Sequence, residues 1–323
     1  MTATASRMHR PQALRERGLT MMELLVTIAI LSLLMAGLTQ LVVTNSQNAS
    51  ATGALARIAD TGRTAIQLLA ADTRRAGYLG GNIDLLNAAD MISGTAGLAA
   101  TLEPGCVAAT TDWARRLDQP LFGLNDTNAG YDCIANDEYT RGDVLTLRYA
   151  ATPPLADGAA KVATRPYLRA TLTEGRLFFG EDANDADNFI DDPSVRDHNL
   201  VAHTYFVGPT GRTCQGAAIP ALFRKAMDDN GLPASQELLA GVENLQLRYL
   251  VDNRYFDADD MPLTATGRWP IIDAVEISVL VRAECPESGF DINRTFELGD
   301  VLYEPAERDF RRQVFTTTTQ LRN

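Results

Sequence analysis

An uncharged and predominantly apolar run of twenty residues, from Leu24 to Val43, constrains this chain more than any other feature of its sequence. At a rise of about 1.5 Å per residue, an α-helix of this length is about 30 Å long and matches the hydrocarbon thickness of a bilayer. The segment before the run is basic, with four arginines against one glutamate: Arg7, Arg10, Arg15, Arg17 and Glu16. The positive-inside rule keeps such a flank cytoplasmic. The sequence therefore predicts one membrane-spanning helix, with the C-terminal bulk of the chain on the outer side.

Gly18 and Glu23 mark the start of this helix. A secretory signal peptide has a shorter apolar core that is followed by a small-residue cleavage site, whereas the small residue Gly18 precedes the apolar run here. We therefore expect the apolar segment to stay on the mature chain. An acidic group inside a membrane span costs roughly 2.5–3.5 kcal/mol on insertion scales and usually marks function. The alternative is that Glu23 is an interfacial carboxylate without a role.

The spacing of these residues favours a function for Glu23. If Leu19 is the first mature residue, Glu23 stands at position five, and the order Gly, Leu, Thr, Met, Met, Glu before a long apolar helix resembles the signature of type IV pilins and pseudopilins. The resemblance implies that prepilin peptidase cuts between Gly18 and Leu19 and methylates the new amino terminus. It also implies that Glu23 pairs with the terminal amine of a neighbouring subunit during assembly. Leu19 replaces the Phe that most pilins carry, which is a conservative apolar change.

Further segments resemble PilW-type minor pilins in the same order along the chain. The sequence from Ala56 to Gly81 contains the stretch Arg-Ala-Gly-Tyr-Leu-Gly, and three later segments are similar to the family: 241–252, 274–282 and 312–323. The resemblance implies a structural protein without a cofactor, held in the inner membrane with its head in the periplasm and incorporated into the pilus. Its implied partners are other minor pilins, the major pilin and prepilin peptidase, with a role in priming pilus assembly. It also allows a position at the pilus tip beside a PilY-type adhesin.

Two alternatives stay open at this stage. A minor pseudopilin of a type II secretion system shares the leader and Glu23, but would be expected to lack the Arg-Ala-Gly-Tyr-Leu-Gly turn and the closing Phe-Thr-Thr-Thr segment. A single-pass anchored periplasmic binding module belongs to another class, and Gly18 and Glu23 would then be accidental. The sequence contains no nucleophile elbow, phosphate loop, zinc-protease motif or dinucleotide fingerprint, so we do not expect an enzyme.

The charge of the chain disfavours nucleic acid as a partner. The precursor has 29 Lys and Arg against 41 Asp and Glu, so that removal of residues 1–18 leaves a mature net charge near −15 before terminal charges. Binding to a phosphate backbone requires Lys and Arg to displace counterions. A local basic patch at Arg311 and Arg312 is the alternative that would permit such contact.

Four cysteines follow the membrane segment, on the side where an oxidising compartment permits disulfides. They are Cys106, Cys133, Cys214 and Cys285, and none forms a C-x-x-C pair. Four cysteines allow three connectivities, which the sequence does not distinguish. We favour Cys106–Cys133, which closes a loop at low entropic cost, and Cys214–Cys285, which joins two strand ends.

No metal site is expected. His198 and His203 belong to no ligand motif, and we interpret them as a solvated surface pair. Two acidic stretches, Glu181 to Asp192 and Asp252 to Asp260, supply carboxylates for a calcium hypothesis but lack the glycine and the closing glutamate of a calcium loop. Solvated acidic loops are the favoured interpretation of both stretches.

The pattern of the chain predicts a helix from about Thr20 to Ala76. After the membrane segment, apolar or small residues recur every three to four positions and form one stripe, which we expect to pack on a globular head: Leu55, Ile58, Gly62, Ala65, Ile66 and Leu69. Gly77, Gly80 and Gly81 are expected to end the helix. Gly37 and Gly53 are predicted as either weak points or close-packing positions. The predicted organisation is a leader at 1–18, a helix at 19–76 with its transmembrane part at 24–43, and a head at 77–323.

The head is predicted to combine an irregular segment, 82–119, with an antiparallel sheet. Residues 144–149, 242–251 and 275–282 alternate apolar and polar side chains, as half-buried strands do. Glu276, Ser278 and Arg282 are predicted to form a solvent-facing side, while the apolar side receives the helix. The expected fold class is α+β and type IV pilin-like, with a long N-terminal helix packed on an antiparallel sheet with long irregular loops.

Overall fold

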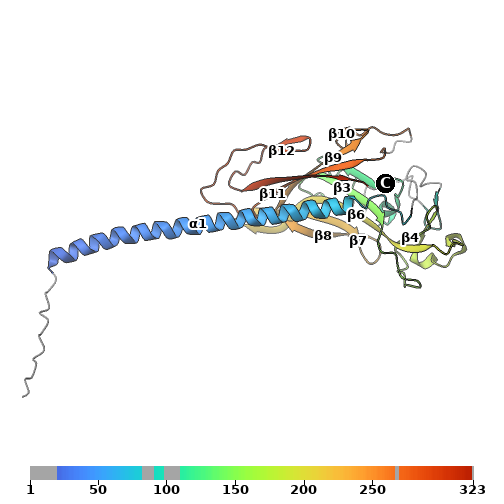
Figure 1. The fold of residues 1–323 in the computed structure, drawn as a ribbon, viewed down its shortest axis with the longest axis horizontal. Helices are drawn as coiled ribbons and strands as arrows, with labels where there is room; N and C mark the ends of the chain where they lie inside the picture. The colour runs from blue at the N-terminus through green and yellow to red at the C-terminus, as the bar shows by residue number, and fades with distance from the viewer. Residues whose placement is uncertain (1–19, 82–90, 98–109, 266–268, 322–323) are drawn as a thin grey trace, which may run out of the picture. The chain divides into compact units, whose positions relative to one another are not determined.

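The computed structural model describes residues 20–81, 91–97, 110–265 and 269–321 (Figure 1). Helix α1, Met21–Thr73, is the one long helix in these ranges, and three short 3-10 helices are also present: η2 Asp112–Arg115, η3 Gly180–Asp182 and η4 Ala186–Asn188. The chain divides into two compact units, Met1–Gly53 and Ala54–Asn323.

The described part of the first unit is the N-terminal portion of α1. Its most apolar stretch of 18 residues has a mean hydropathy of 2.2, and the helix is long and apolar enough to cross a membrane. The large apolar side chains from Leu24 to Val43 are exposed. A surface of this kind, apolar all round the helix, is stable in lipid or against other apolar helices.

In the second unit, the C-terminal portion of α1 packs on the sheets with the predicted apolar stripe. Ile58, Ala65 and Leu69 are at most 2% exposed and belong to the main core, whereas Leu55 is exposed. Helical structure ends at Thr73, three residues before the predicted end. Gly77 and Gly80 then adopt φ values of +84° and +82°, which a residue without a Cβ adopts at little cost.

The larger sheet has eight strands in the order β1-β5-β4-β6-β3-β2, with β7 and β8 added beside β6. All its pairs are antiparallel except β1 with β5. Its strands are β1 Ile92–Ser93, β2 Leu121–Leu124, β3 Arg141–Ala150, β4 Pro166–Ala170, β5 Gly175–Phe179, β6 Arg196–Cys214, β7 Ala217–Met227 and β8 Pro233–Ala240. The long β6–β7 hairpin turns at Gln215 and Gly216, which both have positive φ.

The smaller sheet has four antiparallel strands in the order β10-β9-β11-β14, and a separate hairpin pairs β12 with β13. Their bounds are β9 Val242–Val251, β10 Arg254–Phe256, β11 Ala274–Arg282, β12 Phe296–Leu298, β13 Val301–Tyr303 and β14 Arg312–Gln320. The three predicted strands are therefore present, as β3, β9 and β11. The fold class predicted from the sequence is confirmed.

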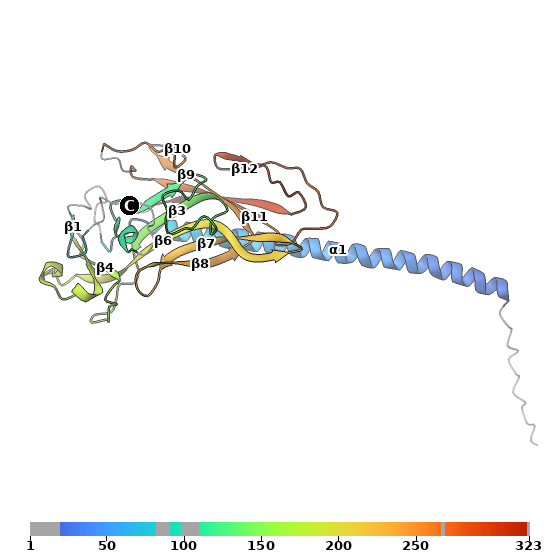
Figure 2. The same ribbon diagram turned by 180° about the vertical axis from the view of Figure 1, so that it is seen from behind.

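One apolar core joins α1 to both sheets. Leu145 and Leu147 of the larger sheet share it with Leu245, Leu247 and the helix stripe. A second core lies against the larger sheet and includes Trp113, Leu168 and Phe206. Figures 1 and 2 show the C-terminal portion of α1 running along the region in which the two sheets meet.

The prediction of a solvent-facing side on β11 is wrong for Ser278 and Arg282, whereas Glu276 is partly exposed. Ser278 and Arg282 are only 2% and 5% exposed. The segment between β11 and β14 covers this face, because Phe296 and Leu298 of its hairpin pack against Leu280. The polar residues that alternate with the apolar ones along β11 therefore lie on a second buried face, where their side chains form hydrogen bonds and ion pairs.

Candidate functional site

The start of α1 places Glu23 in the first helical turn. The backbone N–H of Leu24 donates to the carbonyl of Thr20 at 3.1 Å, which makes Thr20 the N-cap residue. The Thr20 hydroxyl accepts from the Glu23 N–H at 3.3 Å and lies 3.5 Å from the Glu23 carboxylate. This is a form of the capping box, in which a Ser or Thr and a Glu three residues later satisfy the helix terminus together.

The carboxylate of Glu23 is accessible from outside the chain. Its side chain is exposed, as are Met21 and Met22 beside it. An acidic residue in the first turn of a helix interacts favourably with the helix dipole, so the position of Glu23 suits a carboxylate. Gly18 and Leu19, the predicted cleavage and methylation positions, lie outside the described residues.

The distal end of α1 is fixed by a buried carboxylate that the sequence did not single out. Asp72 is 6% exposed and accepts three hydrogen bonds from the larger sheet. His203 Nδ1 lies 2.6 Å and the Tyr205 hydroxyl 2.7 Å from one oxygen, and the Tyr149 hydroxyl donates to the other. We call these four residues the Asp72 latch.

The chemistry of the latch keeps Asp72 ionised. Burial alone would raise the pKa of Asp72, but the hydrogen bond and charge of His203, with the hydroxyls of Tyr149 and Tyr205, outweigh burial and hold this pKa below its usual value. Burial and the charge of Asp72 in turn raise the pKa of both tyrosines, which therefore stay protonated donors. A signal for the latch exists in the sequence, because Asp72 stands three residues after Leu69 on the apolar stripe.

Close packing of the helix on the smaller sheet occurs at Gly62. A Cβ atom at this position would lie 2.1 Å from the ring of Phe315 on β14. The absence of a side chain at Gly62 thus lets the aromatic ring lie directly on the helix backbone. At Gly37, by contrast, a Cβ atom would meet no neighbouring atom within 4 Å, so this glycine makes no such contact within the chain.

The structure places the two histidines differently from the prediction of a solvated surface pair, which is wrong. His198 is 2% exposed, and its Nδ1 lies 2.9 Å from the carbonyl of Ala151. His203 belongs to the Asp72 latch. Both lie on β6, where His198 is buried and His203 is half-buried.

A disulfide joins Cys214, at the end of β6, to Cys285, just after β11. This is the pairing favoured for these two residues in the sequence, and it ties the larger sheet to the smaller one. Cys133 is buried. The other expected bond, Cys106–Cys133, involves Cys106, which lies outside the described residues.

The acidic stretches show ordinary local structure. Asp252 and Asn253 have positive φ and form the turn of the β9–β10 hairpin. In the stretch from Glu181 to Asp192, Asp182 accepts from Thr95 and the Asp185 side chain caps η4. Within the described ranges, no group of three or more His, Cys, Asp or Glu residues is arranged to hold a metal ion.

The basic pair at β14 is neutralised. Arg311 forms an ion pair with Glu287, and Arg312 forms one with Glu243 at 2.6 Å. Two arginines that are each occupied by a carboxylate offer little to a phosphate backbone.

Comparison with known families identifies both ends of the chain. Residues 204–323 match the family described as type IV pilus-assembly protein W, and residues 14–39 match the prokaryotic N-terminal methylation motif. The second match contains Gly18, Leu19 and Glu23. No curated protein sequence matches the chain.

Among solved structures, a type IV-like pilin from Thermus thermophilus is similar to the chain, with 14% sequence identity and a TM-score of 0.38. The match covers 82% of this chain and 96% of that pilin. Identity and score at this level do not place functional residues. The two family matches support the resemblance to PilW-type minor pilins that the sequence indicates.

Proposed function

From the premise that this chain is a minor pilin of the PilW type, we propose that it primes pilus assembly as one member of a minor-pilin complex in the inner membrane, with its head in the periplasm. The same proposal gives it a place at the pilus tip, where a PilY-type adhesin would be its neighbour. Prepilin peptidase is its processing enzyme, acting between Gly18 and Leu19. The role is structural, and the match of residues 204–323 to a pilus-assembly family favours it over a secretion pseudopilin.

The observation that carries the proposal is the exposed start of α1. Glu23 presents a carboxylate at the head of an apolar helix whose side chains are exposed along the whole of Leu24 to Val43. In lipid, such a helix is stable alone, but its carboxylate needs a cationic partner. The methylated amine of a neighbouring subunit supplies a positive charge at the corresponding depth.

The capping geometry permits a sharp test of this role. Glu23→Val removes the charge and the cap together, whereas Glu23→Gln removes the charge and keeps a residue that serves in a capping box. Thr20→Ala is the matched control, because it weakens the cap and keeps the charge. We expect Glu23→Gln to leave the chain inserted and processed while its recovery in sheared pili falls several-fold, and Thr20→Ala to stay near the wild type.

The measurements are immunoblots of membranes and sheared pili, with mass spectrometry of the N-terminus to confirm processing in each variant. Equal incorporation of Glu23→Gln and the wild type would contradict the role of the charge. A loss in Thr20→Ala equal to that in Glu23→Gln would assign the effect to helix capping instead.

A further inference from the structure

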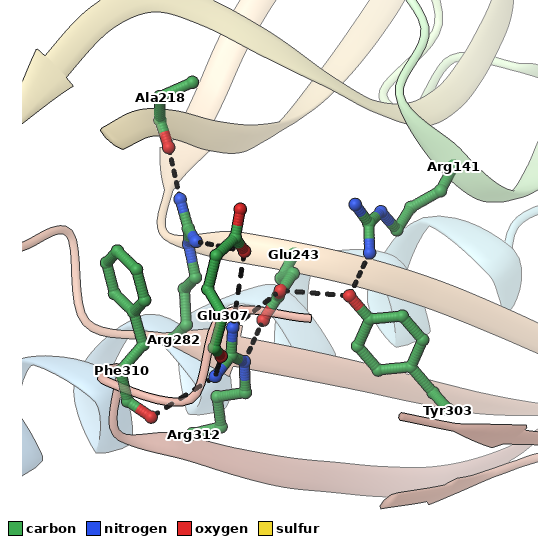
Figure 3. Close-up of polar contacts among 8 residues, drawn as sticks. All are labelled: Arg141, Ala218, Glu243, Arg282, Tyr303, Glu307, Phe310 and Arg312. Carbon is green, nitrogen blue, oxygen red and sulfur yellow. Dashed lines mark hydrogen bonds and ion pairs between the residues drawn. The ribbon is translucent and has the colours of Figure 1, made fainter. Parts of the chain in front are cut away.

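Three arginines and two glutamates lie close together in the head, at one end of the smaller sheet (Figure 3), and four of the five line a small cavity. Arg141 begins β3, Glu243 lies on β9, Arg282 ends β11, and Arg312 begins β14. Glu307 lies in the loop before β14. The cavity has a volume of about 110 Å³ and is lined by Arg141, Glu243, Arg282 and Glu307 together with apolar residues of β7.

One of the two glutamates is fully engaged. Glu243 and Arg312 form a two-pronged ion pair with distances of 2.6 and 3.1 Å, and their side chains are 4% and 2% exposed. Tyr303 also donates its hydroxyl to Glu243 at 3.1 Å. This pair is buried and geometrically complete, so it contributes little free charge to the cavity.

Arg282, in contrast, is buried without a complete set of partners. Its side chain is 5% exposed, its Nη2 donates to the carbonyl of Ala218, and its guanidinium lies over the ring of Phe310 at 4.0 Å. Its Nε is buried and has no hydrogen-bond partner. A buried cation with an unused donor favours a further acceptor at this site.

Arg141 completes the positive side of the cavity. Its Nη1 donates to the Tyr303 hydroxyl, and its guanidinium lies over the Tyr303 ring at 5.2 Å. Within the described part of the chain, no carboxylate forms an ion pair with Arg141. The cavity therefore presents two guanidinium groups whose positive charge is not matched by Glu243.

Glu307 is the remaining counter-charge, and it is held loosely. Its side chain is 57% exposed, and its carboxylate lies 3.4 Å from Arg282 and 3.8 Å from Arg312, at the long end of ion-pair distances. Its backbone carbonyl is fixed separately by Arg312 Nη1 at 2.7 Å. The carboxylate can thus swing out into solvent while the loop stays in place.

We propose that this cavity receives an Asp or Glu side chain of a neighbouring pilin subunit, which displaces the Glu307 carboxylate and binds Arg282 and Arg141. The proposal rests on the proposed function, because it needs a second pilin at this surface. Charge complementarity selects the occupant: displacement of Glu307 leaves three arginines facing Glu243 alone, and a carboxylate is the group that planar guanidinium donors bind best.

The size of the cavity also selects the end of a side chain. At about 30 Å³ for each water molecule, it holds about four waters, whereas sites for whole metabolites span about 300–1,000 Å³. A carboxylate that arrives on a partner already held by other contacts does not bear the full entropic cost of association. A free carboxylate of the same size binds the same groups more weakly.

The test uses the full chain, coexpressed with the other minor pilins and solubilised from membranes in detergent. Arg141→Gln removes the guanidinium that has no carboxylate partner, and Glu307→Gln removes the displaceable carboxylate. Arg212→Gln is the matched control, since Arg212 is an exposed arginine on β6 paired with Glu237. Co-purified minor pilins are quantified by mass spectrometry, and an unchanged unfolding midpoint verifies the fold of each variant.

We expect Arg141→Gln to lower the co-purified minor pilins by about fivefold, the scale of one charge pair. Glu307→Gln should raise them by about twofold or more, and Arg212→Gln should leave them unchanged. Sodium glutarate should release the partners from the wild type more effectively than sodium chloride at equal ionic strength. Equal values for Arg141→Gln and Arg212→Gln, no gain in Glu307→Gln, or equal release by the two salts would overturn the proposal.

These outcomes distinguish a failure of the cavity proposal from a failure of the proposed assembly role. If the wild type co-purifies with minor pilins and all variants behave alike, the cavity proposal fails and the assembly role stands. If no minor pilin co-purifies with the wild type, the assembly role fails, and glutarate is then tested on the purified full chain. A rise in the unfolding midpoint in the wild type and Glu307→Gln, absent in Arg141→Gln, supports a carboxylate site, and no rise in any of them refutes it.

Discussion

Substitution of Asp72 tests whether the latch holds the distal end of α1 on the head. Asp72→Asn preserves the size of the side chain and removes its charge and one of its acceptor oxygens. In one orientation of the new amide, its nitrogen replaces the oxygen that accepts from the Tyr205 hydroxyl and His203, and Tyr149 keeps its acceptor. In the other orientation, the amide nitrogen faces the Tyr149 hydroxyl instead. Either orientation leaves at least one buried donor without its charged acceptor.

The expected loss in the free energy of unfolding follows from the number of hydrogen bonds that Asp72 accepts. A hydrogen bond to a charged group contributes about 1.5–3 kcal/mol, and a buried group left without a partner costs about 1–3 kcal/mol. Because the tautomer of His203 can change to accept from the new amide, we expect a net loss of about 2–3 kcal/mol for Asp72→Asn. Asp60→Asn, an exposed position on the same helix, is the control and should stay within about 0.5 kcal/mol.

The pH dependence of the loss gives a second readout. The folded-state pKa of Asp72 lies below its usual value of 3.8, so the carboxylate contributes stability at every pH above that value. This contribution disappears as the pH falls through the lowered pKa. The free-energy difference between wild type and Asp72→Asn should therefore be full at pH 7 and shrink below about pH 4.

The assay is equilibrium unfolding of the full chain in detergent by denaturant, followed by the fluorescence of Trp113 and Trp269. Trp113 is 1% exposed in the head, so its emission reports loss of tertiary structure. A free-energy change for Asp72→Asn no larger than that for Asp60→Asn at pH 7 would refute the latch. A difference that persists unchanged at pH 3 would refute the account of the pKa.

Three further outcomes are expected. Gly18→Val should block processing, so that mass spectrometry finds only the precursor when prepilin peptidase is coexpressed; a normally processed variant would contradict the cleavage site. Gly62→Ala should lower the free energy of unfolding by about 1–3 kcal/mol through overpacking against Phe315, although alanine is the better helix former, and a more stable variant would contradict this contact. Cys214→Ser should lower the free energy of unfolding by about 4 kcal/mol on the chain-entropy model, given the 71-residue separation of the two cysteines. It should also expose Cys285 to thiol reagents, which peptide mapping without reduction and thiol labelling measure. An unlabelled Cys285 would count against the bond.

The elements with a clear period were predictable from the sequence. The helix stripe at Ile58, Ala65 and Leu69 and the alternation in β9 and β11 are local signals, and burial follows from them directly. The end of the helix was predicted to within three residues, because Gly77 and Gly80 supply the positive φ that the following turn requires. These features depend on residues that are near one another in the chain.

The missed features depend on contacts between distant segments. The burial of Ser278 and Arg282 arises from the hairpin β12–β13, which no pattern within β11 reveals. His203 was predicted to be solvated because its partner, Asp72, lies 131 positions away. The β6–β7 hairpin was also missed, since Pro209 and several glycines interrupt its alternation even though the Gln215-Gly216 turn is a local signal.

Two kinds of contact hold the C-terminal portion of α1 on the head, and they differ in how strongly they depend on direction. Apolar side chains such as Ile58 and Leu69 supply attraction without direction, and a helix that slid by one turn would bury a similar stripe. Asp72 accepts three directed hydrogen bonds, which are lost together when the helix shifts by one turn, about 5.4 Å. The latch therefore fixes the axial position of the C-terminal portion of α1 on the sheets, and Gly62 has the same effect because a Cβ atom there would collide with the Phe315 ring.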